Sequence, residues 1–403
     1  MKILVVNAGS SSLKYQVIDM ANDKVITRGL CERIGLDGRH TNKTDGKKYV
    51  EEVKMDNHAD ALKVVIDCLL SDKVPEIGSL DEIDAVGHRV LHGGEIFADS
   101  AVIDEKVLSQ IEELVPLGPL HQRANISGIK ACEEMMPNVP QVAVFDTTFH
   151  ATMPDYAYRY AIPKEAYTKW KIRKYGFHGT SHKFITGELD KLLGKQGNYI
   201  ICHIGSGASL SAVKAGKCID TTMGYTPLEG VMMGSRSGDI DPSVVEKLMD
   251  ETGMSIHETI SYLNKKSGLL GVSGIADDMR DIELIAFTDE KSTRADDCRL
   301  SLKMHAYRVK KYIGAYFAAL GHVDAICFTA GVGEKGNEYR ESVLSGLEEL
   351  GVVLDHDRNY GGFKKDEINL ISADNSKVKV YVIPTNEELM IAKDTERLIK
   401  NQK

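Results

Sequence analysis

The chain has 403 residues, of which 42% are hydrophobic and 27% are charged, and its formal net charge is −9. This length suits two domains rather than one compact core, and the acidic balance provides no general attraction for nucleic acid or for anionic membranes. The seven cysteines include no Cys-x-x-Cys pair, and no stretch approaches the ~20 apolar residues of a membrane span. We therefore expect a soluble, cytoplasmic protein that lacks a disulfide or zinc framework and binds neither membrane nor nucleic acid.

The first predicted element is a hairpin whose loop is rich in small hydroxyl side chains. The stretch "ILVVNAGSSSLKY" (residues 3–15) begins as an apolar run and breaks into a Gly-Ser-Ser-Ser turn before Lys14. A Walker A loop needs a second Gly before its lysine and a Ser or Thr after it, whereas Leu13 precedes Lys14 and Tyr15 follows it. We therefore expect strands at residues 3–6 and 14–18, joined by a different kind of phosphate-binding turn.

A second version of this hairpin occurs half a chain later. In "NYIICHIGSGASLSAVKAG" (residues 198–216), a strand-like run again leads through one polar residue into a Gly-Ser turn and then into another apolar run. Two ordinary hairpin turns would also produce this pattern, because short Gly/Ser loops recur by chance. We interpret the pair as an internal duplication.

The remaining elements alternate between helix and strand. We expect a helix at 296–320 that ends at Gly321, a buried strand at 323–328, and a strand followed by a helix within 378–399. Thr385 is the predicted N-cap of this last helix, with Glu388 completing a capping box and Glu387 left free for another role. The fold class is therefore α/β. A duplicated α/β unit built around two phosphate hairpins is the actin-like (ribonuclease H-like) ATPase fold, with nucleotide held in a cleft between the halves.

Two motifs suggest other chemistries and are rejected on their context. Residues 331–336 (GVGEKG) match the dinucleotide fingerprint, and Asp355 follows at about the right spacing, but the chain ends too soon to complete a dinucleotide-binding sheet. His178 and His182 have the spacing of two zinc ligands on a helix, but Gly179 stands where a zinc protease needs Glu. We expect the glycines to let the backbone approach a nucleotide.

The chain resembles the acetokinase family in eight blocks that occur in the family's order and cover nearly its whole length. These blocks are "NAGSSSLK" (7–14), "GHRVLHGGE" (87–95), "FDTTFHATMP" (145–154), "YGFHGTSH" (175–182), "HIGSGASL" (203–210), "GSRSGDIDP" (234–242), "FTAGVGE" (328–334) and "PTNEELMIA" (384–392). The resemblance implies reversible transfer of the ATP γ-phosphate to acetate, giving acetyl phosphate and ADP and leading to acetyl-CoA. It also implies Mg²⁺, for which Mn²⁺ can substitute, and a homodimer.

The resemblance implies two domains of different roles. Residues 1–150 together with 384–403 would form the N-terminal actin-like domain, which carries the substrate and metal. Residues 151–383 would form the C-terminal actin-like domain, which binds nucleotide and supplies the dimer interface.

The residues that match the family's catalytic positions include cations, which a reaction between two anions, a carboxylate and a phosphate, requires. Arg89 would hold the substrate carboxylate and Arg236 would stabilise the transferring phosphoryl group, because guanidinium matches carboxylate and phosphate geometry. His178 would donate a hydrogen bond to that group. Asp146 matches the family's proton donor or acceptor, but acetate is already ionised at neutral pH and needs no base, so we expect Asp146 to orient Mg²⁺ instead.

The other matching positions would bind metal, nucleotide and the acyl group. Asn7 and Glu387 are the metal-linked positions, although a Glu at a helix start is often explained by the helix dipole alone. Leu91, Leu120, His121, Phe177 and Pro227 would form the acyl site, in which the bulk of Leu91 favours acetate over propionate. The nucleotide positions are Ser10, Ser12, Lys14, His203, Ile204, Gly205, Ser206, Gly207, Asp278, Met279, Arg280, Gly331, Val332, Gly333, Glu334 and Lys335.

The family commonly has Asn where this chain has Ser206 and Lys335, so nucleotide preference is open to change here. Three other functions remain as alternatives: a propionate or other short-chain acyl kinase of the same family, a sugar or polyol kinase of the same fold, and an actin-like ATPase without an acceptor. The paired arginines argue against the last two.

Overall fold

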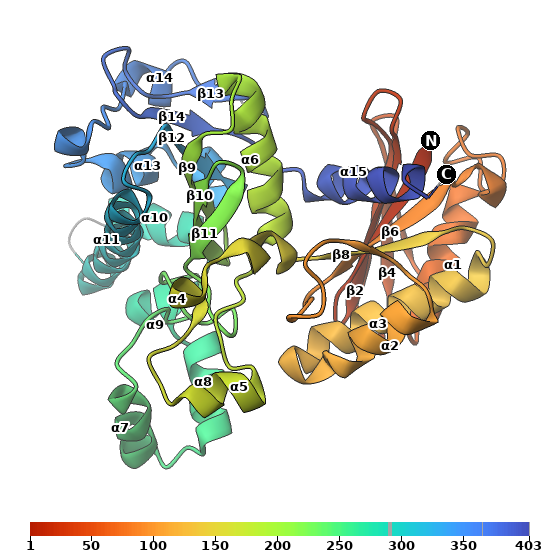
Figure 1. Cartoon of the computed structure of the whole chain (residues 1–403), viewed down its shortest axis with the longest axis horizontal. Coiled ribbons are helices and arrows are strands. Elements are labelled where there is room, and N and C mark those ends of the chain that lie inside the picture. The colour runs from red at the N-terminus through yellow and green to blue at the C-terminus, as the bar shows by residue number, and fades with distance from the viewer. Residues whose placement is uncertain (289–291, 365, 403) are drawn as a thin grey trace. The chain divides into compact units, whose positions relative to one another are not determined.

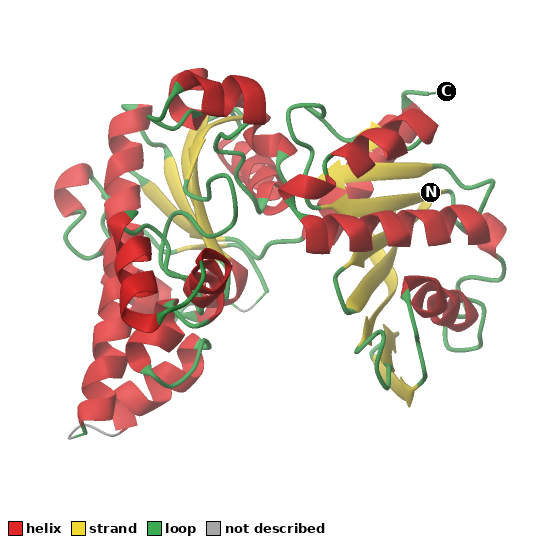
Figure 2. Cartoon of the chain, turned by 90° about the horizontal axis from the view of Figure 1, so that it is seen from below, coloured by secondary structure: helices red, strands yellow, loops and turns green. Residues whose placement is uncertain are grey.

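The structure is a computed structural model that describes residues 1–288, 292–364 and 366–402. The chain divides into two compact units: unit 1 comprises Met1–Ala151 and Asn386–Lys403, and unit 2 comprises Thr152–Thr385 (Figure 1). Helices lie on both faces of the sheet in each unit (Figures 1 and 2). The short 3₁₀ helices are Leu80–Glu82, Val115–Leu117, Thr148–Thr152 and Glu348–Leu350.

The described residues of unit 1 form a sheet of eight strands in the order β5-β4-β3-β2-β1-β6-β8-β7. Its strands are β1 (Lys2–Ala8), β2 (Ser12–Asp19), β3 (Lys24–Glu32), β4 (Arg39–Thr44), β5 (Lys47–Glu52), β6 (Ala85–Val90), β7 (Ala101–Val102) and β8 (Gln141–Phe145). Its helices are α1 (His58–Leu69), α2 (Glu105–Glu113), α3 (Pro119–Met135) and α15 (Glu387–Lys400).

The alternating side chains of β1 explain why helices cover both faces of this sheet. Leu4 and Val6 pack into one core with side chains of α1 and α3. Ile3 and Val5 point the other way and pack against side chains of α15. The carboxy-terminal helix therefore belongs to the first unit of the chain.

Unit 2 contains a sheet whose described strands follow the order β11-β10-β9-β12-β14-β13. Its strands are β9 (Asn198–Ile204), β10 (Ala208–Lys214), β11 (Lys217–Thr221), β12 (Ala325–Thr329), β13 (Asn369–Leu370) and β14 (Lys379–Val382). Its helices are α4 (Asp155–Tyr158), α5 (Lys164–Trp170), α6 (Gly179–Leu193), α7 (Ser243–Thr252), α8 (Ile256–Lys265), α9 (Gly268–Ser273), α10 (Met279–Thr288), α11 (Thr293–Leu320), α12 (Ala330–Lys335), α13 (Asn337–Leu344) and α14 (His356–Tyr360).

The two sheets repeat one topology, as the internal duplication predicted. In unit 1, β1 pairs antiparallel with β2 and parallel with β6, which pairs parallel with β8. In unit 2, β9 pairs antiparallel with β10 and parallel with β12, which pairs parallel with β14. The hairpin interpretation of both Ser-rich loops is confirmed, and so is the α/β class.

The prediction for the start of the last helix was wrong. Asn386, not Thr385, is the N-cap of α15, and its side chain accepts a hydrogen bond from the Leu389 N–H at 3.0 Å. The Thr385 hydroxyl instead lies 2.8 Å from the Ser181 hydroxyl. Glu387 and Glu388 are consequently the first two residues of the helix, where carboxylates are stabilised by the helix dipole, and Glu388 completes no capping box.

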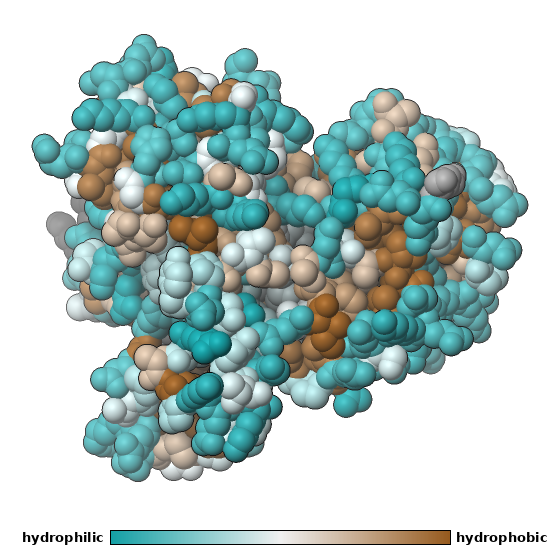
Figure 3. Space-filling model, in the orientation of Figure 1, coloured by the Kyte–Doolittle hydropathy of each residue, from teal (hydrophilic) through white to brown (hydrophobic). Residues whose placement is uncertain are grey.

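All seven cysteines lie within the described residues, and each is free and buried. Burial raises the pKa of the Cys31 thiol to about 12 and raises that of the Cys202 thiol further. In the described part of the chain no helix is both long and apolar enough to span a membrane. The face shown in Figure 3 is mostly hydrophilic, with apolar side chains in small groups.

Candidate active site

In unit 1, an arginine and an aspartate pair at the ends of two parallel strands. Arg89 is near the end of β6 and Asp146 directly follows β8, and the parallel pairing of these strands brings both to one edge of the sheet. The Arg89 Nη2 donates a hydrogen bond to the Asp146 Oδ2 at 2.6 Å. Asp146 is only 1% exposed, so this ion pair holds the guanidinium in a fixed position.

A second carboxylate, Glu387, shares the electrostatic environment of this pair. Burial raises the pKa of Glu387 to about 7, and Asp146 raises it as well, whereas Arg89 and Lys14 act in the opposite direction. Burial alone would lower the pKa of Arg89, but the charges of Asp146 and Glu387 outweigh it and hold that pKa above its usual range. Two carboxylates that repel each other are well suited to a shared cation.

The donor set fits Mg²⁺. Asn7 stands directly opposite Lys14 in the β1–β2 hairpin, and Lys14 interacts with Glu387. An amide oxygen and carboxylate oxygens are ligands that Mg²⁺ accepts, and this ion keeps several waters. Among the described residues, no three or more His, Cys, Asp or Glu are grouped so that they could hold a metal ion by themselves.

The predicted acyl-site residues of unit 1 lie around the start of α3. Leu91 is 8% exposed, and its Cδ2 would be 2.6 Å from a Cβ at Gly118, so the leucine side chain packs directly over this glycine. Leu120 and His121 follow within the first turn of α3 and are exposed. In the hairpin turn, Ser10 is exposed and Ser12 is half-buried.

In unit 2, three histidines form a network that the sequence only partly revealed. The His178 Nδ1 and the His182 Nε2 both lie within hydrogen-bond distance of the Ser209 hydroxyl, at 2.9 and 2.8 Å. The His203 ring stacks on that of His178 with 4.2 Å between centroids, and its Nδ1 lies 2.8 Å from the Ser181 hydroxyl. His178 itself has a left-handed backbone with a φ of 58°.

Sequence reasoning missed Ser209 and assigned no role to Ser181. It set aside His182 together with the zinc motif. The spacing of His178 and His182 correctly indicated that the two side chains lie close together. It was tested only as a pair of metal ligands, not as two partners of one hydroxyl group.

Arg236 reaches the same part of unit 2. A Cβ at Gly207 would be 3.5 Å from the His178 Nε2 and 3.7 Å from the Arg236 Nη1, so both side chains lie beside the second Gly-Ser turn. The Arg236 Nη1 also donates to the Pro227 carbonyl oxygen at 3.3 Å. Burial lowers the pKa of Arg236. Phe177, next to His178, is buried.

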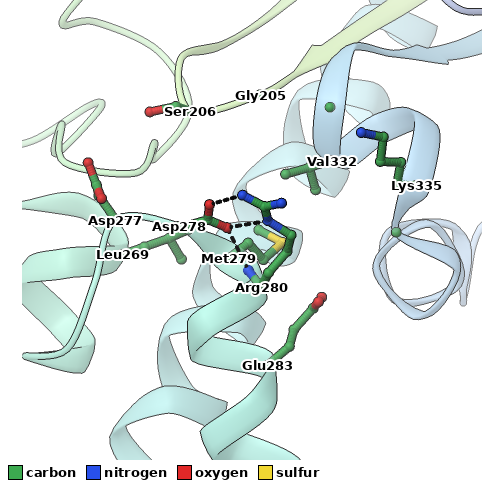
Figure 4. A pocket seen from close by; sticks show the side chains of 12 residues that line it. Gly205, Ser206, Leu269, Asp277, Asp278, Met279, Arg280, Glu283, Val332 and Lys335 are labelled. Carbon is green, nitrogen blue, oxygen red and sulfur yellow. Dashed lines mark hydrogen bonds and ion pairs between the residues drawn. The ribbon is translucent and has the colours of Figure 1, made fainter.

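Unit 2 also contains a pocket of about 350 Å³ formed largely by predicted nucleotide residues. Asp278 and Arg280 form a two-point ion pair at its wall, with distances of 3.0 Å from Nε to Oδ1 and 2.5 Å from Nη2 to Oδ2 (Figure 4). This pair lowers the pKa of Asp278 to about 2. The lining residues are Gly205, Ser206, Leu269, Asp277, Asp278, Met279, Arg280, Glu283, Gly331, Val332, Lys335 and Gly336.

Several predicted nucleotide residues lie outside this lining. His203 belongs to the histidine network, and Glu334 accepts a hydrogen bond from the Thr385 N–H at 3.1 Å. Gly333 is buried in α12, and a Cβ there would be in ordinary contact with the Phe328 and Cys202 backbone at 3.5–3.6 Å. Ile204 ends β9, and Gly207 lies beside His178. Ser10, Ser12 and Lys14 are in unit 1.

The chain is similar to known proteins along its whole length. The acetokinase family model matches residues 2–393. Acetate kinase from Caldanaerobacter subterraneus subsp. tengcongensis is 55% identical, with both chains fully covered, and acetate kinase from Thermotoga maritima is 52% identical over 99% of each chain. The crystal structure of Porphyromonas gingivalis acetate kinase superposes with a TM-score of 0.93 at 43% identity over 99% of each chain, and that of a Francisella tularensis propionate kinase with 0.90 at 40% identity over 98% of this chain and 99% of that one.

Proposed function

Because this chain belongs to the acetokinase family, we propose that it is an acetate kinase that transfers the γ-phosphoryl group of ATP reversibly to acetate, giving acetyl phosphate and ADP. The observation that carries this proposal is the Arg89–Asp146 pair at the edge of the unit 1 sheet. A fixed guanidinium is the group that a carboxylate acceptor needs when it meets a phosphate. A sugar kinase would need a general base instead.

In this mechanism the residues of unit 1 bind and orient the acceptor. Acetate arrives ionised, so its oxygen is nucleophilic without a base. Arg89 binds the carboxylate. Asp146 holds Arg89 in place and would orient Mg²⁺, rather than moving a proton. Asn7 and Glu387 would hold Mg²⁺, which supplies charge neutralisation to the phosphates when bound.

The residues of unit 2 act on the donor. The pocket beside Asp278 and Arg280 takes the nucleotide. Arg236 and His178 stabilise charge on the phosphoryl group in flight, which is the main contribution a protein makes to phosphoryl transfer. Ser209 lies at hydrogen-bond distance from the His178 Nδ1 and so orients the imidazole ring that acts on the phosphoryl group.

The preferred acid is acetate rather than propionate. Leu91 packs against Gly118, and a hydrophobic side chain in the acyl site discriminates against one added methylene on the acid by about 1–3 kcal/mol. The second candidate function is a propionate or other short-chain acyl kinase, because the Francisella tularensis propionate kinase has a similar structure. We further propose that the enzyme works as a homodimer in the cytoplasm, where its free thiols stay reduced, and that acetyl phosphate is passed on towards acetyl-CoA.

A hydroxylamine-trapping assay with ATP, Mg²⁺ and a series of short carboxylates tests the function. We expect acyl hydroxamate from acetate at the highest kcat/KM, less from propionate, and almost none from Arg89→Gln. Arg123→Gln removes an exposed arginine of α3 and should match the wild type. The proposal would be overturned if no acid gave hydroxamate, or if the rate of ATP hydrolysis did not depend on the added acid.

A further inference from the structure

Unit 1 carries a second polar groove, which begins at Lys14 beside Glu388 and extends along the sheet past the residues used in the proposed reaction. It has a volume of about 580 Å³ and is formed mainly by strands β2 to β5, which extend the sheet beyond the β1–β2 hairpin (Figure 1). Most of its charged lining residues are basic, including Arg28, Arg39, Lys43 and Lys48. The net charge of the whole chain is −9, so this concentration of positive charge is local.

Three of these cations stand side by side across the sheet. Strand pairing places Arg28 directly opposite Lys43, and Lys43 directly opposite Lys48. Like charges at directly opposite positions destabilise a sheet. All three residues are exposed, and none of them makes an ion pair with a described residue. We call Arg28, Lys43 and Lys48 the basic rung.

Protection of the sheet edge explains only part of this arrangement. Lysine on an outer strand prevents edge-to-edge association, and this accounts for Lys48 on β5. Arg28, however, lies on β3, two strands further in. Gln16 is opposite Arg28 at the inner end of the rung, and its Oε1 is buried without a hydrogen-bond partner among the described residues.

We propose that the basic rung binds a linear oligophosphate, a chain of about three consecutive phosphates, either free or as the tail of a nucleoside triphosphate. Neighbouring strands are about 4.8 Å apart, so three cations on adjacent strands extend over about 10 Å. A row of charges of this length matches an anion whose charge is spread along a line better than a single phosphate. Gln16 lines the groove at the inner end of the rung.

Nucleic acid fits this groove less well. Single strands are held by aromatic side chains on which bases stack, and the aromatic lining residue here, Tyr15, is only 2% exposed. The negative net charge of the protein would also repel a long polyanion outside the groove.

Calorimetric titration of the full chain with sodium tripolyphosphate tests this site. The triple variant Arg28→Gln, Lys43→Gln, Lys48→Gln should bind roughly 10- to 100-fold more weakly, because it loses three exposed charge contacts. The matched control is Lys47→Gln, Lys63→Gln, Lys106→Gln, which removes the same charge from exposed lysines of unit 1 that do not line the groove and should keep wild-type affinity. Both variants should keep the wild-type hydroxamate activity.

A second titration in saturating ADP separates the two sources of the ligand. Unchanged affinity in ADP identifies free oligophosphate as the ligand, and competition by ADP that disappears in the rung variant identifies nucleotide phosphates. Equal affinity of the rung variant and the wild type would overturn the proposal, and so would an equal loss in the lysine control. Tighter, rung-dependent binding of a single-stranded oligonucleotide would overturn the choice of ligand.

Discussion

Removing Arg89 should destabilise unit 1 as well as abolish activity, because the arginine is the counter-ion of a buried carboxylate. Asp146 is 1% exposed and Arg89 is 19% exposed, and their side chains are 2.6 Å apart. Loss of one partner from a buried pair costs about 3–5 kcal/mol, since the remaining charge stays buried without compensation. Arg89→Ala would also leave Asp146 and Glu387 to repel each other with one cation fewer.

Urea denaturation followed by circular dichroism measures this cost. We expect Arg89→Ala to lose about 3–5 kcal/mol of unfolding free energy near pH 7. The double variant Arg89→Ala, Asp146→Asn should recover most of that stability, because no uncompensated Asp146 charge remains. Lys130→Ala, which breaks the exposed Lys130–Glu112 pair in the same unit, should change stability little.

Activity separates the structural role of the pair from its chemical role. The double variant should remain inactive in the hydroxamate assay, because a stable fold without Arg89 still cannot bind the carboxylate. The reasoning would be refuted if Arg89→Ala lost less than about 1 kcal/mol, or if Asp146→Asn did not restore stability.

Three further predictions concern the same sites. In metal-free buffer, stability should fall as pH rises from about 4.5 to 7, because the pKa of Glu387 is about 7 in the fold and about 4.5 when the chain is unfolded. Melting curves of Glu387→Gln should lack this component. Ser209→Ala should lower kcat roughly 10- to 100-fold with little change in KM for ATP, because His178 and His182 lose their shared hydroxyl, whereas Ser209→Thr should retain activity. Leu91→Ala should raise the kcat/KM ratio of propionate to acetate about tenfold, and an unchanged ratio would exclude Leu91 from the acyl site.

The elements that could be predicted from sequence are those specified by neighbouring residues. The two hairpins follow from apolar runs on either side of a Gly-Ser turn, and the end of α11 follows from Gly321. The start of α15 could not be predicted as easily, because Thr385 and Asn386 are both good N-caps. Only the folded chain reveals that the Thr385 hydroxyl lies beside Ser181.

Features that depend on strand register were not visible in the sequence. The basic rung joins Arg28, Lys43 and Lys48 from three strands, and their alignment is fixed only when those strands pair. The same holds for Ser209, which meets His178 and His182 only because β10 and α6 pack within one unit. The Arg89–Asp146 pair also depends on register, because the parallel pairing of β6 with β8 brings Arg89 to the strand end that Asp146 follows.

The buried cysteines allow the unfolding of each unit to be measured separately. Cys31, Cys68 and Cys132 lie in unit 1, and Cys202, Cys218, Cys298 and Cys327 lie in unit 2. A thiol that is buried and has a raised pKa reacts with an alkylating reagent only after the surrounding structure opens. Mass spectrometry of peptides labelled during unfolding would therefore give two separate rates from one unmodified chain, one for each half of the duplication.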